Sequence, residues 1–296
     1  NLNVNGLSHA ALTAEIMIRL EKIFEEEKPN IILIYGDTNT TLAAALTAKK
    51  MKIKIGHIEA GLRQRPKDMP EEINRVLTDH LSDFLFVTSK NAIINLKKEN
   101  ITHNVHLVGD VMYDIFLEHK DRFEYKYVFN HKLKKYDYVL VTLHRDFNVD
   151  DKFVLNNILH SLIKINQIHK IVLVVHPRTQ KNISRFGLDK LLVDLKTISP
   201  QGYIEMMSLV KYSNFVITDS GGLQKEAFLL GVPCITLRTE SEWPETLAGG
   251  MNVLAPHGED LQALAARSVS PTAKRNQPYG DGSTADRIVK LLLESA

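Results

Sequence analysis

Three carboxylate residues follow predicted strands of one sheet, where they could carry acid/base chemistry. The apolar segment 31–35 predicts a buried strand and is followed by Asp37, while the next strand, 54–58, is followed directly by Glu59. A proline-containing loop then leads to a predicted helix whose first turn holds Glu71. Ligands of parallel sheets collect beyond the carboxyl ends of the strands, and paired acids can remove and return protons near neutral pH. Taken singly, Asp37 could be a helix cap, and Glu71 could simply favour a helix N-terminus.

A second group of residues has the pattern of an anion-binding turn. The apolar run 215–217 predicts a buried strand, 219–222 reads Asp-Ser-Gly-Gly, and 223–230 has helical spacing. Glycines let a backbone approach an anion closely, and the N–H groups at a helix N-terminus attract it. Glu226, one turn into this helix, could accept hydrogen bonds from a ribose. An ordinary strand-to-helix turn of a Rossmann-like sheet would show the same pattern, so this segment alone leaves both interpretations open.

A histidine–arginine pair follows another predicted strand, 138–142. His144 and Arg145 stand at its carboxyl end, which is the place for phosphate binding or proton transfer. A lone histidine after a strand is also a common structural residue that bonds to its own surroundings. The adjacent arginine favours the functional interpretation.

The composition excludes several classes of protein. A net charge of +2 over 296 residues gives no basic excess for nucleic acid or an anionic membrane surface. No apolar run approaches the ~18 residues of a membrane span, and no G-x-G-x-x-G fingerprint indicates a nicotinamide cofactor. No His/Cys/Asp spacing indicates a metal. The single cysteine, Cys234, lies in an apolar strand, where we expect an inert core thiol in a reducing cytoplasm.

Strands and helices alternate in two blocks, which predicts an α/β fold with two Rossmann-like domains facing a cleft. The charged and aromatic segment 119–136 has poor periodicity and is interpreted as the crossover between domains. We therefore place an N-terminal domain at 1–118 and a second domain at 119–278. The predicted helix in 279–296 is expected to return to the first domain.

Six short motifs carry a resemblance to a known family. The sequence resembles the non-hydrolysing UDP-N-acetylglucosamine 2-epimerases over nearly all of its length, and the resemblance implies the GT-B architecture. Each motif alone is weak, and the specificity comes from their order. The motifs are GDT (36–38), HIEAGLR (57–63), PEEINR (70–75), LHR (143–145), TDSGG (218–222) and PYGDG (278–282).

The resemblance also implies a role for individual residues. The acid/base and charge-stabilising group would be Asp37, Glu59, Glu71 and His144. The residues expected to contact the UDP-sugar are Arg145, Gln201, Met206, Ser220, Gly221, Gly222, Glu226, Arg238 and Trp243. The second domain would hold the uridine diphosphate, with the backbone around Gln201 and Met206 reading the uracil. The resemblance implies neither cofactor nor metal.

The implied reaction is reversible inversion at C2 of UDP-N-acetylglucosamine, giving UDP-N-acetylmannosamine by loss and re-addition of UDP through a glycal. Four alternatives stay open: C2 epimerisation of a UDP-linked diacetamido uronic acid, a hydrolysing epimerase, a GT-B glycosyltransferase, and a non-catalytic UDP-binding module. The expected partner is the UDP-sugar, without nucleic acid or membrane, in a cytoplasmic homodimer.

Two departures from the family pattern affect these expectations. Relatives begin with a βαβ portion carrying a Gly-Thr-Arg-Pro-Glu loop, and this sequence has no such motif. A chain lacking that portion is expected to be poorly stable and inactive. Trp243 stands where many relatives have arginine in the loop 238–245. Its ring could stack on a sugar, or it could merely pack the loop against the second domain.

Overall fold

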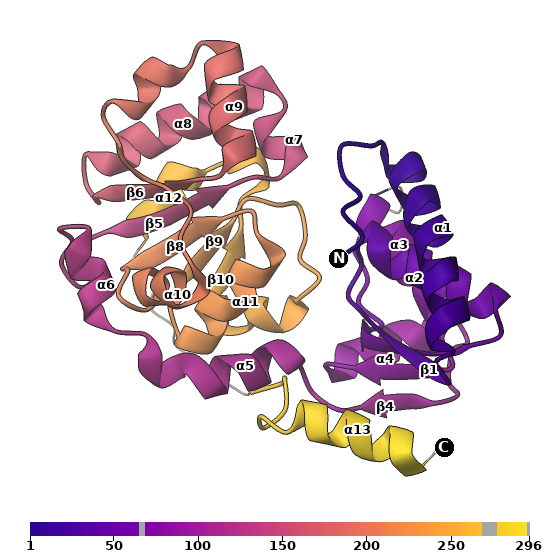
Figure 1. The fold of residues 1–296 in the computed structure, drawn as a ribbon. Coiled ribbons are helices and arrows are strands. Elements are labelled where there is room, and N and C mark those ends of the chain that lie inside the picture. The colour runs from indigo at the N-terminus through magenta and orange to yellow at the C-terminus, as the bar shows by residue number, and fades with distance from the viewer. Residues whose placement is uncertain (65–68, 268–276, 295–296) are drawn as a thin grey trace. The chain divides into compact units, whose positions relative to one another are not determined.

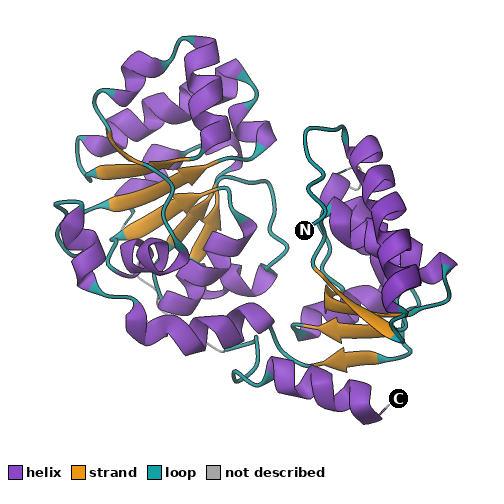
Figure 2. Cartoon of the chain, viewed as in Figure 1, coloured by secondary structure: helices purple, strands orange, loops and turns teal. Residues whose placement is uncertain are grey.

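The computed structural model describes residues 1–64, 69–267 and 277–294 (Figure 1). The chain divides into two units. Unit 1 comprises residues 1–117 and 276–296, and unit 2 comprises residues 118–275. Each unit is a parallel sheet with helices packed against it, as Figure 2 shows by colour. The predicted α/β class with two Rossmann-like domains, as in the GT-B architecture, is confirmed.

Unit 1 is built on a four-stranded sheet in the order β1-β2-β3-β4. All of its strand pairs are parallel, so the carboxyl ends of the strands lie at one edge. Its elements are α1 (His9–Glu27), β1 (Ile31–Tyr35), α2 (Asn39–Lys50), β2 (Lys54–Ala60), α3 (Pro70–Leu81), β3 (Phe84–Val87), α4 (Lys90–Lys98), β4 (Val105–Leu107) and α13 (Thr284–Glu294). Helix α5 (Val111–His119) begins in unit 1 and ends in unit 2.

The two faces of the unit 1 sheet carry separate apolar cores. On one face, Ile34 and Ile55 pack with the alanine-rich helix α2 and with Leu20 of α1. On the other, Phe86 packs with Ile288 of α13. The C-terminal helix therefore completes the core of unit 1.

Unit 2 contains a six-stranded sheet in the order β10-β9-β8-β5-β6-β7, again parallel throughout. Its elements are η1 (Lys120–Arg122), α6 (Tyr125–Asn130), β5 (Val139–Leu143), α7 (Asp146–Val149), α8 (Lys152–Asn166), β6 (Ile171–Val175), α9 (Pro177–Phe186), η2 (Asp189–Leu192), β7 (Lys196–Ile198), α10 (Tyr203–Lys211), β8 (Phe215–Thr218), α11 (Gly221–Leu230), β9 (Cys234–Thr236), η3 (Pro244–Gly250), β10 (Asn252–Leu254), η4 (Pro256–Gly258) and α12 (Leu261–Ala266).

The strand order of unit 2 fixes where a ligand can bind. The chain runs outward from β5 through β6 to β7, then returns to the middle and runs the other way from β8 through β9 to β10. Strands β5 and β8 are therefore neighbours whose outgoing connections diverge. Ligands of open parallel sheets bind at such a switch point, outside the carboxyl ends of the two strands.

The segment interpreted as an irregular crossover contains two helical pieces, η1 and α6. Val128 and Leu133 are buried there, so these residues form part of the core of unit 2. No helix in the described part of the chain is long and apolar enough to cross a membrane.

Candidate functional site

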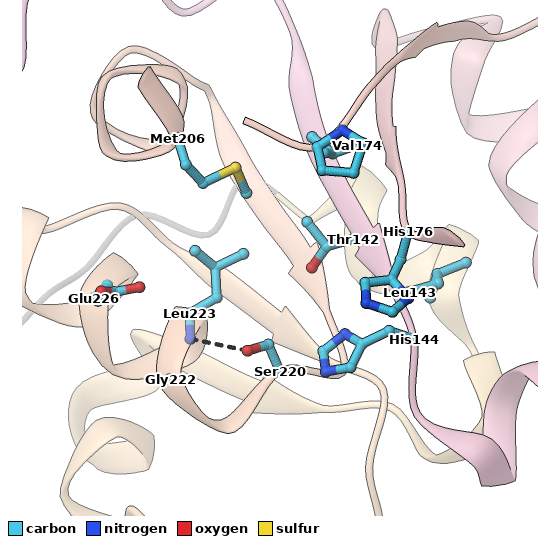
Figure 3. Close-up of a pocket in the computed structure, with 11 residues that line it drawn as sticks. Thr142, Leu143, His144, Val174, His176, Met206, Ser220, Gly222, Leu223 and Glu226 are labelled. Carbon is cyan, nitrogen blue, oxygen red and sulfur yellow. Dashed lines mark hydrogen bonds between the residues drawn. The ribbon is translucent and has the colours of Figure 1, made fainter. Parts of the chain in front are cut away.

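A pocket of about 260 Å³ lies at the switch point of unit 2 (Figure 3). His144 follows β5 directly, His176 follows β6, and Ser220 follows β8, so the carboxyl ends of three strands supply its wall. Helix α11 contributes Glu226 at the other end of the pocket, and α10 contributes Met206 above it. The lining consists of Thr142, Leu143, His144, Val174, His176, Pro200, Met206, Ser220, Gly222, Leu223 and Glu226.

The N-terminus of α11 forms the floor of this pocket. Ser220 is the N-cap, and its hydroxyl accepts a hydrogen bond from the Leu223 N–H at 3.3 Å. The turn packs tightly against the loop after β9. A Cβ atom on Gly221 would lie 2.1 Å from Oε1 of Glu242, and Glu242 is paired with Arg238 at 2.5 Å. Glycine is favoured at this position because a methyl group would have to displace the buried Glu242 side chain.

His144 is held by a buried carboxylate. Its Nδ1 lies 3.1 Å from Oδ1 of Asp219, whose side chain is fully buried. The backbone N–H groups of His144 and Arg145 donate to the same carboxylate, as does the Asn148 side-chain amide. Burial would raise the pKa of Asp219, but the hydrogen bond and charge of His144 and the backbone donors hold it below its usual value. The carboxylate is therefore ionised and saturated with donors.

A second histidine stands beside the first. The ring centroids of His144 and His176 are 5.5 Å apart, and both rings lie at the same end of the pocket (Figure 3). Burial, followed by the proximity of His144, lowers the pKa of His176 below its usual value. A neutral His176 next to the Asp219–His144 pair provides a further polar contact for an anion or its proton.

The other predicted binding residues of unit 2 take different positions. Glu226 is 9% exposed. Burial of Tyr203, followed by the negative charge of Glu226, raises the pKa of Tyr203 to about 12. The Gln201 side-chain amide donates to the Ser199 carbonyl at 2.8 Å and contacts the His131 ring at 3.3 Å. Pro200 and Met206, on either side of the α10 N-terminus, line the pocket.

Trp243 is buried, with 3% of its surface exposed. The ammonium group of Lys225 lies 3.7 Å from the centre of its ring, and Lys225 is itself fully buried. Stacking of this ring on a sugar would require the loop after β9 to open. The contact supports the alternative in which Trp243 packs the loop against α11.

In unit 1, Asp37 is part of a charged cluster beyond β1. Its carboxylate lies 2.5 Å from the guanidinium of Arg75, which also contacts Glu72 at 3.0 Å. The Asn74 side-chain amide donates to the Asp37 carbonyl at 2.8 Å. Helix α3 therefore positions the segment that follows β1. Glu71 lies in the first turn of that helix, one turn before Arg75.

Glu59 occupies a strained position at the end of β2. Its φ is +73°, and the register with β3 shifts between Ile58 and Ala60. A side chain rarely adopts this conformation, and such strain is concentrated at functional sites. Its Oε1 lies 3.8 Å from the position of a Cβ on Gly36, so the carboxylate faces the residue before Asp37. The structure thus brings Asp37 and Glu59 to adjacent strand ends, beside the helix that carries Glu71.

A buried network of charged side chains connects the ends of β1 and β2. Nδ1 of His57 lies 2.6 Å from Asp79, and its Nε2 lies 2.9 Å from the Gly36 carbonyl. Asp79 also accepts hydrogen bonds from Gly61 N–H and from Arg63. Burial alone would lower the pKa of His57, but Asp79 raises it above the usual value. A protonated His57 can donate to both of its partners at once and so ties β1 to β2. Within the described residues, no three His, Cys, Asp or Glu side chains could hold a metal ion.

The model of the UDP-N-acetylglucosamine 2-epimerase family matches residues 1–293. This chain belongs to that family. A UDP-N-acetylglucosamine 2-epimerase of Methanocaldococcus jannaschii is 42% identical over 304 residues, which cover 99% of this chain and 83% of the relative. A UDP-2,3-diacetamido-2,3-dideoxy-D-glucuronate 2-epimerase of Pseudomonas aeruginosa is 42% identical over 299 residues, covering 98% and 82%.

Solved structures of the epimerase family agree with this assignment. The structure of the Methanocaldococcus jannaschii enzyme in complex with UDP-N-acetylglucosamine and UDP has a TM-score of 0.91 and 40% identity, covering 99% of this chain and 84% of that one. The Neisseria meningitidis enzyme bound to UDP-N-acetylglucosamine has a TM-score of 0.84 and 31% identity, covering 98% and 83%. The resemblance to the family is confirmed.

Four residues of the two polar groups described above, one group in each unit, were not singled out as site residues from the sequence. His176 and Asp219 join the polar group of unit 2, and Glu72 and Arg75 join that of unit 1. The TDSGG motif contains Asp219, but only the strand order places it beside His144. His176 directly follows an apolar strand, as His144 does. This pattern in the sequence could have indicated His176 as a site residue.

Proposed function

We propose that this protein catalyses the reversible C2 epimerisation of UDP-N-acetylglucosamine to UDP-N-acetylmannosamine by eliminating and re-adding UDP. The observation that carries the proposal is the pocket at the switch point between β5 and β8, with His144 and the α11 N-terminus at its end. This arrangement suits a diphosphate. It occurs in a chain whose relatives are named for this reaction and solved with these ligands.

In the proposed reaction, unit 2 holds UDP. The N–H groups of Gly221 and Gly222 in the first turn of α11 attract the diphosphate, and the N-cap Ser220 places its hydroxyl beside them. Glu226, one turn further along the pocket, accepts hydrogen bonds from the ribose hydroxyls. The uracil then lies toward Met206, whose neighbouring backbone supplies donors and acceptors.

The two arginines of unit 2 have different proposed roles. Arg145 gives its backbone N–H to the carboxylate that holds His144, and its cationic side chain adds positive charge near the diphosphate. Arg238 is 2% exposed and paired with Glu242 behind Gly221. We propose that Arg238 supports the turn and does not touch the phosphates. We propose that the backbone at Gln201 contacts the uracil, because Gln201 directly follows Pro200, which lines the pocket.

Unit 1 supplies the acids and bases. One carboxylate of Asp37, Glu59 and Glu71 removes the C2 proton while the C1–O bond to UDP breaks, and the electron pair of the C–H bond forms the C1=C2 double bond of a glycal. Return of UDP to C1 and of a proton to the opposite face of C2 gives the epimer. Arg75 forms a close ion pair with Asp37, whereas Glu59 faces Gly36 at the end of β2 and Glu71 lies in the first turn of α3. Separate environments let two carboxyl groups act as acid and base in one site.

The reaction in deuterated water tests this function. We expect deuterium at C2 of both epimers, equilibration from either epimer, and no accumulation of free UDP at completion. Glu226→Gln is the matched binding control, because it should weaken UDP binding while leaving C2 chemistry at saturating substrate. UDP-sugar binding without C2 exchange would instead indicate a binding module. Net release of UDP with free N-acetylmannosamine would indicate a hydrolysing epimerase.

A second substrate is favoured by one observation. The relative named for UDP-2,3-diacetamido-2,3-dideoxy-D-glucuronate is as similar to this chain as the archaeal UDP-N-acetylglucosamine 2-epimerase, at 42% identity. Competition between the two UDP-sugars in one reaction, followed by C2 deuterium in each, gives the ratio of kcat/KM. A ratio above one for UDP-N-acetylglucosamine supports the main proposal, and a ratio below one overturns the choice of sugar.

We also propose that the protein works as a homodimer in the cytoplasm. Cys234 is fully buried, and burial raises the pKa of its thiol to about 12. A chain with this single inert thiol is compatible with a reducing compartment. Sedimentation velocity at micromolar concentration distinguishes a dimer from a monomer of 33.5 kDa.

A further inference from the structure

Asp219 is placed where its charge is unfavourable for the proposed ligand. It directly precedes Ser220, the N-cap of the helix whose N-terminus attracts an anion. A buried carboxylate beside a diphosphate would repel it, and a fully buried charge is expensive unless it is paired. An alternative role must therefore account for the carboxylate at this position.

The contacts of Asp219 identify what it holds. Oδ1 lies 3.1 Å from Nδ1 of His144 and also accepts the His144 backbone N–H at 3.1 Å. Oδ2 accepts the Arg145 N–H at 3.0 Å and the Asn148 amide at 3.2 Å. Both oxygens thus serve the few residues that follow β5. Among the groups that contact Asp219, the imidazole of His144 is the one ring. The His144 side chain is 31% exposed and lines the pocket.

We infer that Asp219 is a positioning residue for His144 and fixes the proton of its ring on Nδ1. An ionised carboxylate can only accept hydrogen bonds, so the facing Nδ1 must be the donor. The other nitrogen, Nε2, is then directed away from Asp219. A carboxylate that orients a functional histidine in this way determines its tautomer as well as its angle.

This inference rests on the proposed function for its chemical consequence. During elimination, the C2–H and C1–O bonds break, the C1=C2 bond forms, the proton goes to a carboxylate of unit 1, and the departing oxygen of UDP becomes an anion. When the ring is protonated, Nε2–H donates to that oxygen while Nδ1–H remains with Asp219. The imidazolium charge is offset by Asp219 in the ground state and is available to the leaving group as its charge develops.

Asp219→Asn is the direct test, because it keeps the shape of the side chain and removes its charge. The amide N–H group facing the ring needs an acceptor, so Nδ1 should lose its proton and Nε2 should gain it. Nitrogen-15 NMR of histidine-labelled protein at alkaline pH, with His144→Gln to assign the signal, reports which nitrogen carries the proton. We expect the wild type to show the Nδ1–H form and the variant to show the Nε2–H form.

Kinetics give the second readout. We expect kcat of Asp219→Asn to fall on the order of 10²-fold, because the protonated ring that donates to the leaving oxygen loses the carboxylate that offsets its charge. The Kd for UDP should stay the same or decrease, since a repulsive charge has gone. A merely structural role would weaken UDP binding and turnover together. Asn148→Ala is the control, because it removes one donor to Asp219 and leaves the contact with the ring. It should keep the wild-type tautomer and most of kcat.

Two results would overturn the inference: the same His144 tautomer in wild type and Asp219→Asn, or an unchanged kcat in a variant whose tautomer has switched. The NMR measurement needs no turnover. It therefore tests the role of Asp219 even if the protein acts on a different sugar, and failure of the proposed function would show instead as absent C2 exchange in the wild type.

Discussion

Replacing Gly221 with alanine should destabilise unit 2 through one specific contact. The new methyl carbon would lie 2.1 Å from Oε1 of Glu242, which would have to retreat by about 1.3 Å to reach an ordinary separation of 3.4 Å. Glu242 has no room to do so freely, since it is 7% exposed and paired with Arg238 at 2.5 Å. The methyl group therefore acts on a buried ion pair.

The magnitude follows from two cases. If the pair shifts as a unit, the cost is that of overpacking, about 1–3 kcal/mol. If the pair separates, a buried charge loses its partner, at about 3–5 kcal/mol. Alanine recovers up to about 1 kcal/mol by its higher helix propensity. After this gain, the two cases give about 0–2 and about 2–4 kcal/mol. Because Glu242 has no room to retreat together with Arg238, we expect the second case, a net loss of about 2–4 kcal/mol in the free energy of unfolding.

A matched variant separates this contact from a general effect of removing glycine. Gly202, the N-cap of α10, would place its methyl carbon 2.6 Å from Oε2 of Glu205, but Gly202 is exposed and the Glu205 side chain can rotate away. Gly202→Ala should cost less than about 1 kcal/mol. Denaturant unfolding of both variants, followed by Trp243 fluorescence in unit 2, makes the comparison. A Gly221→Ala loss below about 0.5 kcal/mol, or equal losses in both variants, would refute this reasoning.

Three further predictions concern chemistry, pH and the loop after β9. Glu71→Gln should lower turnover at least ~10²-fold while UDP still binds, and C2 exchange at the wild-type rate would show that Glu71 is not in the acid/base group. The pKa of His57 is raised and that of Asp79 is lowered, so their pairing stabilises the fold fully between about pH 3.8 and pH 6.5. That stabilisation is lost as pH rises through the elevated pKa of His57. The difference in unfolding free energy between wild type and His57→Gln should therefore decrease over that range when it is measured across a pH series. Trp243→Ala should weaken UDP and UDP-sugar to the same extent, because Lys225 covers the ring; calorimetric titration with a larger loss for the UDP-sugar would restore the stacking role.

The sequence predicts individual elements of this fold well, because burial shows directly in the residue types. The apolar run 31–35 coincides with β1, and 215–217 differs from β8 by one residue. The short helix α6 was not predicted because its apolar residues Val128 and Phe129 have no clear helical spacing and lie among charged ones. Its stability comes from tertiary packing, with Val128 fully buried, and such packing is not visible in a local pattern.

The candidate site shows the same limit at the level of topology. A strand end can be predicted from its own segment, and so His144 and the Ser220 turn could be proposed separately. Their proximity depends on β8 pairing with β5 and not with β7, the strand that precedes it in the chain. No local signal specifies this reversal of strand order.

The reversal also explains why a carboxylate is needed at this place. Because β5 and β8 diverge beyond their last paired residues, Thr142 and Thr218, the chain segments that follow have no ladder hydrogen bonds between them. The N–H groups of His144 and Arg145 would be left without acceptors at the base of the pocket, and unsatisfied backbone donors are costly. Asp219 accepts both of them. The residue that closes the gap between the two strands is thereby placed against the ring of His144, so the same carboxylate can complete the fold at the switch point and orient the side chain that faces the substrate.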